Sequence, residues 1–397
     1  MFYFNILPWI ILIYFEYKIK SPFIILSLCA GLLYFLSVPL IIGNYPVWVG
    51  EEVNRLAFIF FVVYLFSRFI INTLFKISYK KIFPNDLDKV KKISFLFMFI
   101  AIFFSFASFG FSYNAMINSN WTDYRDNAGI TGLIVQYSYL CGSSLLLIGL
   151  LQKDKKIIIF SVFAGLFFLF VLKSRGYLIS LVLPVVCYYF LNDKMSLKRI
   201  SFILLTVVIV VALYIFTRYI RIIGSLSDVN FSNLNFSDIL GEDAGELQLI
   251  DVLFQVIFRK DYHYLHVDNL VTIKNFIYFF IPDFVVDKPK DLAYAVWDYY
   301  IGIRGVNGSF HPTVIGEAYF NNKNYGVIIY PIFLASLIGL YEKVLSRRPE
   351  FLILVYGVVV FSATALARGS SHNAFVVMII CIIVLYTFYR VGFRWKY

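Results

Sequence analysis

The chain has 397 residues, of which 60% are hydrophobic and only 15% charged, and its formal net charge is +11. This composition excludes a large soluble domain and indicates an integral membrane protein. The positive charge alone would also suit a nucleic-acid-binding protein, but its placement in short loops argues against that class.

Eleven apolar runs along the chain approach the length of a membrane-spanning helix, about 20 residues. They fall near 2–17, 22–42, 55–75, 93–114, 129–151, 157–173, 176–191, 200–217, 324–342, 351–367 and 373–390. No internal repeat supports the inverted-repeat layout of many transporters. We therefore expect an all-α polytopic membrane protein: helices one to eight in 1–217, one large loop in 218–323, and helices nine to eleven in 324–397.

Clusters of Lys and Arg follow every second helix, and by the positive-inside rule they mark the cytoplasmic side. They are Lys18 and Lys20; Lys76, Lys80, Lys81, Lys89, Lys91 and Lys92; Lys153, Lys155 and Lys156; Lys194, Lys198 and Arg199; Lys343, Arg347 and Arg348; and Arg390, Arg394 and Lys396. This alternation predicts an external N-terminus and a cytoplasmic C-terminus. Because the excess charge is mostly a topology signal, we expect membrane lipid and no nucleic acid as a partner.

The 218–323 loop is therefore predicted to be external. It holds nine basic and thirteen acidic residues, and its many aromatic and aliphatic residues favour folded structure over disorder. We expect a helix over 244–258, a second one over 270–281 that lies at the membrane face or packs in an external cap, and a third from Pro312 to about Phe320.

The third helix follows Arg304, Gly305, Gly308 and Ser309. Exposed backbone amides with the positive end of a helix behind them can hold a phosphate, and an arginine adds a charged fork. The pattern is also that of an ordinary glycine turn before a helix, so both interpretations stay open.

Five arginines are predicted at the external face: Arg175, Arg218, Arg221, Arg304 and Arg368. Positive residues are depleted from short external loops, and Arg suits phosphate oxygens through a rigid multi-donor fork. The alternative is that each is an interface anchor or a partner of a loop carboxylate. Arg55 and Arg125, beside Glu51/Glu52 and Asp123/Asp126, are interpreted as solvated charge pairs.

Candidate acids and bases are Glu317, His311, Asp298, His263, His266 and His372. Glu317, five residues after Pro312 on the same short helix, is the best-placed carboxylate, with a salt-bridge or capping role as the alternative. The two histidines of the HYLH stretch, His263 and His266, lack the partners of a zinc site. Cys29, Cys141, Cys187 and Cys381 all fall in apolar segments and are interpreted as small buried hydrophobes. No metal site and no cofactor are expected.

Three features resemble O-antigen and capsule repeat-unit polymerases. They are the run from Gly308 through Glu317-Ala318-Tyr319 with the Tyr325-Gly326 step after it; Ile281-Pro282 followed by Lys288-Pro289; and Ser174-Arg175-Gly176 before the seventh helix. The helix number and the single large late loop are also similar, whereas the spacing from Arg304 to Gly316 only approximates the family pattern. The layout resembles that of a GT-C-like glycosyltransferase.

The resemblance implies polymerisation of undecaprenyl-pyrophosphate-linked repeat units at the outer face of the bacterial plasma membrane. A growing glycan on undecaprenyl pyrophosphate would be the donor and one lipid-linked repeat unit the acceptor, with a chain-length regulator as a further partner. The five arginines would stabilise the leaving pyrophosphate, and Glu317 or His311 would take the proton of the attacking hydroxyl. No nucleotide sugar is expected.

Two other functions stay open. An O-antigen ligase, which transfers the finished glycan to lipid A core or to protein, has a similar architecture. A lipid-linked oligosaccharide flippase would show more evenly spaced helices, charged residues at the middle of the membrane and no long external loop, so the sequence favours it less.

Overall fold

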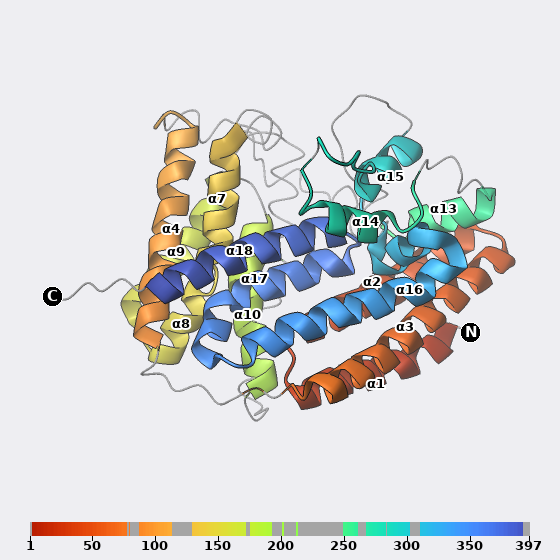
Figure 1. Cartoon of the computed structure of the whole chain (residues 1–397), viewed down its shortest axis with the longest axis horizontal. Helices are drawn as coiled ribbons and strands as arrows, with labels where there is room; N and C mark the ends of the chain where they lie inside the picture. Colours follow the sequence, from red (N-terminus) through yellow and green to blue (C-terminus); the bar gives the residue numbers. More distant parts are fainter. Residues whose placement is uncertain are drawn as a thin grey trace, which may run out of the picture. The chain divides into compact units, whose positions relative to one another are not determined.

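The structure, a computed structural model, describes residues 2–77, 79, 87–112, 129–171, 175–192, 201, 212, 249–260, 267–282, 284–301 and 310–391. In this part of the chain every regular element is a helix (Figure 1). Seven helical stretches are long and apolar enough to cross a membrane: Ile24–Asn44, Val47–Phe75, Asp88–Ser108, Gly129–Gln152, Thr313–Leu345, Pro349–Ala367 and Ser371–Val391. The chain is therefore an α-helical multi-pass membrane protein, as predicted. The count of eleven spans stays a prediction.

The chain divides into two compact units. The first comprises Met1–Tyr79, Ala244–Arg347 and Ser362–Val376, and the second comprises Lys80–Asp243, Arg348–Phe361 and Val377–Tyr397. Helices α17 (Pro349–Ala367) and α18 (Ser371–Val391) contribute residues to both.

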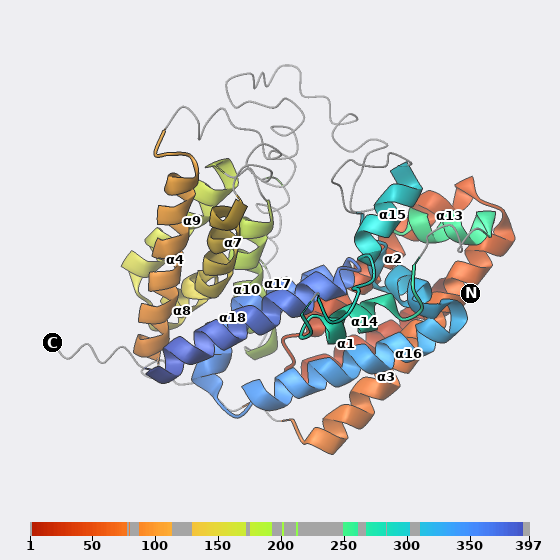
Figure 2. The same cartoon turned by 45° about the horizontal axis from the view of Figure 1, so that its top comes forward.

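The first unit is built around the packing of α3 (Val47–Phe75) on α16 (Thr313–Leu345), which run side by side in both views (Figures 1 and 2). The buried residues of α3 recur every three or four positions, which is the stripe of a helix with one face in a core; they include Val49, Val53, Leu56, Phe60, Tyr64, Arg68 and Ile71. Helices α1 (Ile6–Ile19) and α2 (Ile24–Ile41) pack against each other, and α1 also packs on α3. Short 3₁₀ helices at Phe2–Asn5 and Ile42–Asn44 precede α1 and follow α2.

The second unit contains α4 (Asp88–Ser108), α7 (Gly129–Gly142), α8 (Leu145–Gln152), α9 (Lys155–Val171) and α10 (Arg175–Asn192). Helix α4 packs mainly on α7, and α9 packs on α8 and α10. Ten of the predicted apolar runs coincide with helices of the described residues. The eighth, 200–217, lies almost wholly outside them.

The described parts of the long loop are helical. Helix α13 (Asp251–Arg259) covers the last part of the predicted 244–258. Residues 249–250 form a turn, and 244–248 lie outside the described residues. Helix α14 (Val271–Tyr278) falls within the predicted 270–281. Helix α15 (Leu292–Ile301) was not predicted. The predicted helix after Pro312 and the predicted ninth span form the single helix α16, which is broken at Asn322 and Lys323.

Candidate functional site

A buried carboxylate, Glu317, joins three segments of the first unit. Only 2% of this residue is exposed. Its Oε1 accepts hydrogen bonds from the Thr272 hydroxyl on α14 at 3.0 Å and from the Ser371 backbone amide at 3.4 Å. Its Oε2 accepts from the Tyr330 hydroxyl at 3.1 Å and from the Ser371 hydroxyl at 2.6 Å. Four donors satisfy the carboxylate, so it ties α14 and the start of α18 to α16.

The turn before α18 packs closely on the first residue of α16. The Thr313 backbone amide donates to the Arg368 carbonyl oxygen at 2.9 Å. Gly369 has φ +83°, a conformation that favours glycine, and a Cβ built there would lie 2.5 Å from the Thr313 carbonyl oxygen. Glycine at 369 therefore permits the approach that brings Ser371 to Glu317.

We name Glu317 and its partners Thr272, Tyr330 and Ser371 the Glu317 network. Helix α16 breaks a few residues after Glu317. Asn322 has φ −179° and ψ 51°, and Lys323 has φ 49° and ψ −131°. The preceding Asn321 is anchored, because its Nδ2 donates to Thr272 Oγ1 at 3.1 Å and its Oδ1 accepts from the Thr272 amide at 3.0 Å. On the other side of the break, a Cβ on Gly326 would collide with the Ala318 carbonyl oxygen. The surroundings thus hold Lys323 at a positive φ that is strained for a residue with a side chain.

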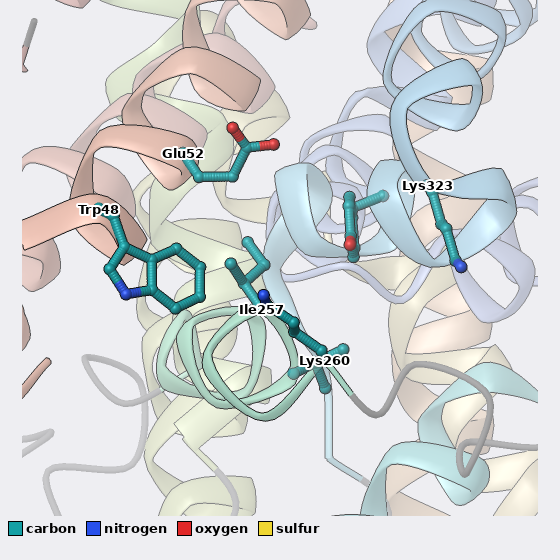
Figure 3. A pocket seen from close by; sticks show the side chains of 7 residues that line it. Trp48, Glu52, Ile257, Lys260 and Lys323 are labelled. Carbon is teal, nitrogen blue, oxygen red and sulfur yellow. The ribbon is translucent and has the colours of Figure 1, made fainter. Parts of the chain in front are cut away.

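A cavity of about 460 Å³ lies beside this break (Figure 3). Its lining comes from α3, α13 and its C-cap, and α16: Trp48, Glu52, Val256, Ile257, Lys260, Tyr319 and Lys323. Figure 3 shows Trp48 and Glu52 extending from α3, with Ile257 and Lys260 from the α13 segment and Lys323 from α16 around the same space. Tyr319 and Lys323 belong to the segment that the Glu317 network holds in place.

The pocket combines aromatic rings with charges of both signs. The Lys260 ammonium lies 5.5 Å from the centre of the Trp48 ring, a cation–π distance. Glu52 accepts a two-pronged hydrogen bond from Arg55 at 2.8 and 2.5 Å, which confirms the predicted charge pair. Arg55 also donates to Asn324 Oδ1 at 3.2 Å, just after the break. This lining suits a ligand with a flat apolar face, hydroxyl groups and negative charge.

Two of the predicted site residues meet near the start of α16. Burial and, to a smaller extent, the positive charge of Arg368 lower the pKa of His311 from 6.5 to about 4. His311 Nδ1 is buried and has no hydrogen-bond partner among the described residues. Arg368 is exposed. At neutral pH His311 is therefore an uncharged imidazole beside a guanidinium.

The other predicted arginines are not brought to this place by the described residues. Arg304, Arg218 and Arg221 lie outside the described residues, as do His263 and His266. Arg175 begins α10 in the second unit, and its side chain is not described. The convergence of five arginines on one cavity stays a prediction.

Two further candidates have local contacts. Asp298 on α15 forms an ion pair with Lys290. His372 packs its ring against Phe279, with ring centres 6.4 Å apart, and its Nδ1 has no hydrogen-bond partner among the described residues. Within the described ranges, no group of three or more His, Cys, Asp or Glu side chains is placed to hold a metal ion.

Sequence reasoning missed the pocket because its walls come from residues far apart in the chain. Glu52 was interpreted only as part of a charge pair with Arg55, and no sequence pattern connects it with Trp48, Lys260 or Lys323. One available signal was Gly326, since a glycine kept inside a helical pattern can have a packing reason, and here a Cβ would collide with the Ala318 carbonyl oxygen.

Comparisons of the whole chain with protein-family models, with curated proteins and with solved structures found no match.

Proposed function

We propose that this protein is a glycosyltransferase that joins undecaprenyl-pyrophosphate-linked oligosaccharide repeat units into O-antigen or capsular polysaccharide at the outer face of the bacterial plasma membrane. The proposal combines the resemblance of the Gly308–Tyr319 run with the pocket beside it. No cofactor is part of the proposal.

The observation that carries it is the pocket lining. Two aromatic side chains, Trp48 and Tyr319, offer flat apolar surfaces for the faces of a sugar ring. The Glu52 carboxylate can accept hydrogen bonds from sugar hydroxyls, and the Lys260 and Lys323 ammonium groups suit phosphate oxygens. Tyr319 belongs to the motif run itself, so the run contributes directly to a surface of this chemistry.

The proposed reaction transfers the growing glycan. An acceptor hydroxyl attacks the anomeric carbon of the donor, a new glycosidic C–O bond forms, and the bond to pyrophosphate breaks. Undecaprenyl pyrophosphate leaves with the bonding electron pair, and a base takes the hydroxyl proton. Arg368 and the other predicted arginines would stabilise the charge that develops on the pyrophosphate.

Glu317 and His311 remain the proposed bases. His311 is uncharged at neutral pH, which a base requires. Both oxygens of Glu317 already accept hydrogen bonds, so Glu317 can act only if the acceptor hydroxyl replaces one of its four donors. Without such an exchange, Glu317 acts by positioning Tyr319 and Lys323.

The test uses the purified full-length protein in lipid nanodiscs with undecaprenyl-pyrophosphate-linked repeat units. A ladder of polymers, formed equally in EDTA, is the expected product. Trp48→Ala should reduce the yield strongly, whereas Phe66→Ala, at an exposed position further along α3, should not.

Three outcomes would contradict the proposal. Transfer only to an added lipid A core or protein acceptor would indicate a ligase. Movement of the intact lipid-linked unit across the bilayer without a new bond would indicate a flippase. Activity lost in EDTA and restored by magnesium would refute the metal-independent reaction.

A further inference from the structure

Three ionisable side chains meet inside the first unit, away from the pocket. The Arg68 guanidinium on α3 lies between Glu16 on α1 and Glu342 on α16, with nitrogen–oxygen distances of 3.1 and 2.9 Å. All three side chains have 0% exposure. We name Glu16, Arg68 and Glu342 the ionic cluster.

Hydroxyl groups surround this ionic cluster. Ser21 donates to Glu342 Oε1 at 2.5 Å, and Tyr79 donates to the same oxygen at 3.0 Å. Ser21 Oγ also accepts from Arg68 Nη2 at 3.3 Å. Ser27 Oγ on α2 lies 2.9 Å from Glu16 Oε2. Two hydroxyl groups therefore donate to Glu342 and one lies beside Glu16, and each carboxylate also contacts Arg68.

Counted over the residues that the structure describes, the charges of the ionic cluster do not balance. Two carboxylates and one guanidinium give a net charge of −1 in a place that excludes water. Burying an uncompensated charge is far more costly than burying a neutral, hydrogen-bonded group. The neighbouring cation, Lys343, donates instead to the Phe75 carbonyl oxygen. One bound proton makes the ionic cluster neutral.

We propose that the ionic cluster is a proton-binding site and that Glu16 is the carboxyl group that holds the proton. Glu342 keeps its charge, because two hydroxyl groups donate to it, whereas Glu16 has one hydroxyl partner. Glu16 Oε1 accepts from Arg68 Nε, and its protonated Oε2 donates to Ser27 Oγ at the same 2.9 Å.

A further polar side chain, Tyr64, lies beside the ionic cluster and leaves its net charge unchanged. The Tyr64 residue on α3 is only 2% exposed, and its hydroxyl has no hydrogen-bond partner in the described part of the chain. It lies within the electrostatic reach of all three members of the ionic cluster. Its hydroxyl group is neutral, so Tyr64 adds no positive charge to the ionic cluster.

Infrared spectroscopy tests the proposal, because a protonated carboxyl group has a carbonyl stretching band that a carboxylate lacks. The wild-type minus Glu16→Gln difference spectrum at neutral pH should contain this band, and the band should shift in D₂O. Glu16→Gln, which mimics the neutral acid in shape, should retain the wild-type melting temperature.

A matched pair of variants assigns the proton to one residue. Ser27→Ala removes the partner of Glu16 Oε2 and should move the band to higher frequency. Ser21→Ala, the same change at a hydroxyl that contacts Glu342, should leave it in place. A band that responds to Ser21→Ala instead would place the proton on Glu342, and spectra unchanged by Ser27→Ala would show that Glu16 is ionised. Either result overturns the proposal, independently of the glycosyltransferase assay.

Discussion

The Ser371 hydroxyl donates a 2.6 Å hydrogen bond to Oε2 of Glu317. It joins the first turn of α18 to α16 five residues before Asn322, where α16 breaks. The same carboxylate also binds Thr272 and Tyr330, so one buried group fixes the segment that supplies Tyr319 and Lys323 to the pocket.

The Glu317 network separates a positioning role from a role as base. Glu317→Gln puts an amide NH₂ against hydroxyl donors and should cost about 1–3 kcal/mol of stability. If Glu317 is a positioning residue, the activity of the variant should fall in proportion to its loss of stability. The stability is measured as the melting temperature in detergent. A base instead loses about 10²–10⁴-fold in rate with the fold intact. Ser371→Ala should destabilise in the same direction, and wild-type activity in Glu317→Gln would remove Glu317 from both roles.

The role of the pocket carboxylate, Glu52, can be tested by comparison with the adjacent Glu51. Glu52→Gln should raise the KM for the lipid-linked saccharide by about tenfold or more, since a hydrogen bond to a charged group contributes roughly 1.5–3 kcal/mol. Glu51→Gln changes the adjacent exposed carboxylate, which does not line the pocket, and should leave KM unchanged. Equal effects of the two substitutions would mean that only the overall charge matters.

Two substitutions of Lys323 distinguish the effect of backbone strain from the effect of the side-chain charge. Lys323→Gly and Lys323→Ala remove the same ammonium group, but only glycine adopts φ 49° and ψ −131° without strain. Lys323→Gly should therefore be more stable than Lys323→Ala by about 1–3 kcal/mol. Both should bind a pyrophosphate-linked saccharide less tightly than the wild type. Identical melting temperatures for the two variants would argue against a strained backbone.

His311 gives the folded protein a pH dependence. Its pKa is lowered to about 4 in the fold and is 6.5 when unperturbed, so the unfolded state binds the proton more tightly. Stability should be complete above about pH 6.5 and fall as the pH drops towards 4. His311→Asn should flatten this part of the melting-temperature profile. Arg368→Gln should flatten it partly, because the Arg368 charge contributes to the lowered pKa.

Orientation is tested by reporter fusions. The alternation of basic clusters predicts that reporters within 225–320 are external and that those at 85 and 347 are cytoplasmic. The pocket would then face the lipid-linked substrates. A reporter that is active in the cytoplasm when fused at 290 would reverse the orientation and remove the basis of the proposed location.

Hydropathy and helix signals predicted much of the fold, because both are local properties of the sequence. Pro312 begins a helix at the expected place, and the predicted gap between Phe320 and residue 324 is where α16 breaks. The turn at residues 249–250, inside the predicted helix 244–258, shows the limit of this reasoning, since an apolar helical pattern does not by itself fix where a helix begins.

The pocket and the ionic cluster depend on tertiary contacts between residues hundreds of positions apart. Nothing in the sequence indicates, for example, that Glu52 and Lys323 line the same pocket. The ionic cluster left a clearer trace: Arg68 is an isolated charge in an apolar segment, and such residues commonly pair with another charge. Glu16 and Glu342 lie near the ends of apolar segments, close to Lys18 and Lys343. Which of them pair could not be deduced without the packing of α1, α3 and α16.

The break in α16 also determines how the helix fits a bilayer. All 33 residues in one straight helix would extend about 50 Å, well beyond a hydrocarbon thickness of about 30 Å. Residues 324–345 alone extend about 33 Å, which matches that thickness with little tilt. The first nine residues can then leave the helix axis at an angle that bilayer thickness helps to set. Because Lys323 lies at this joint and also lines the pocket, hydrophobic mismatch with the surrounding lipid would change the shape of the pocket directly.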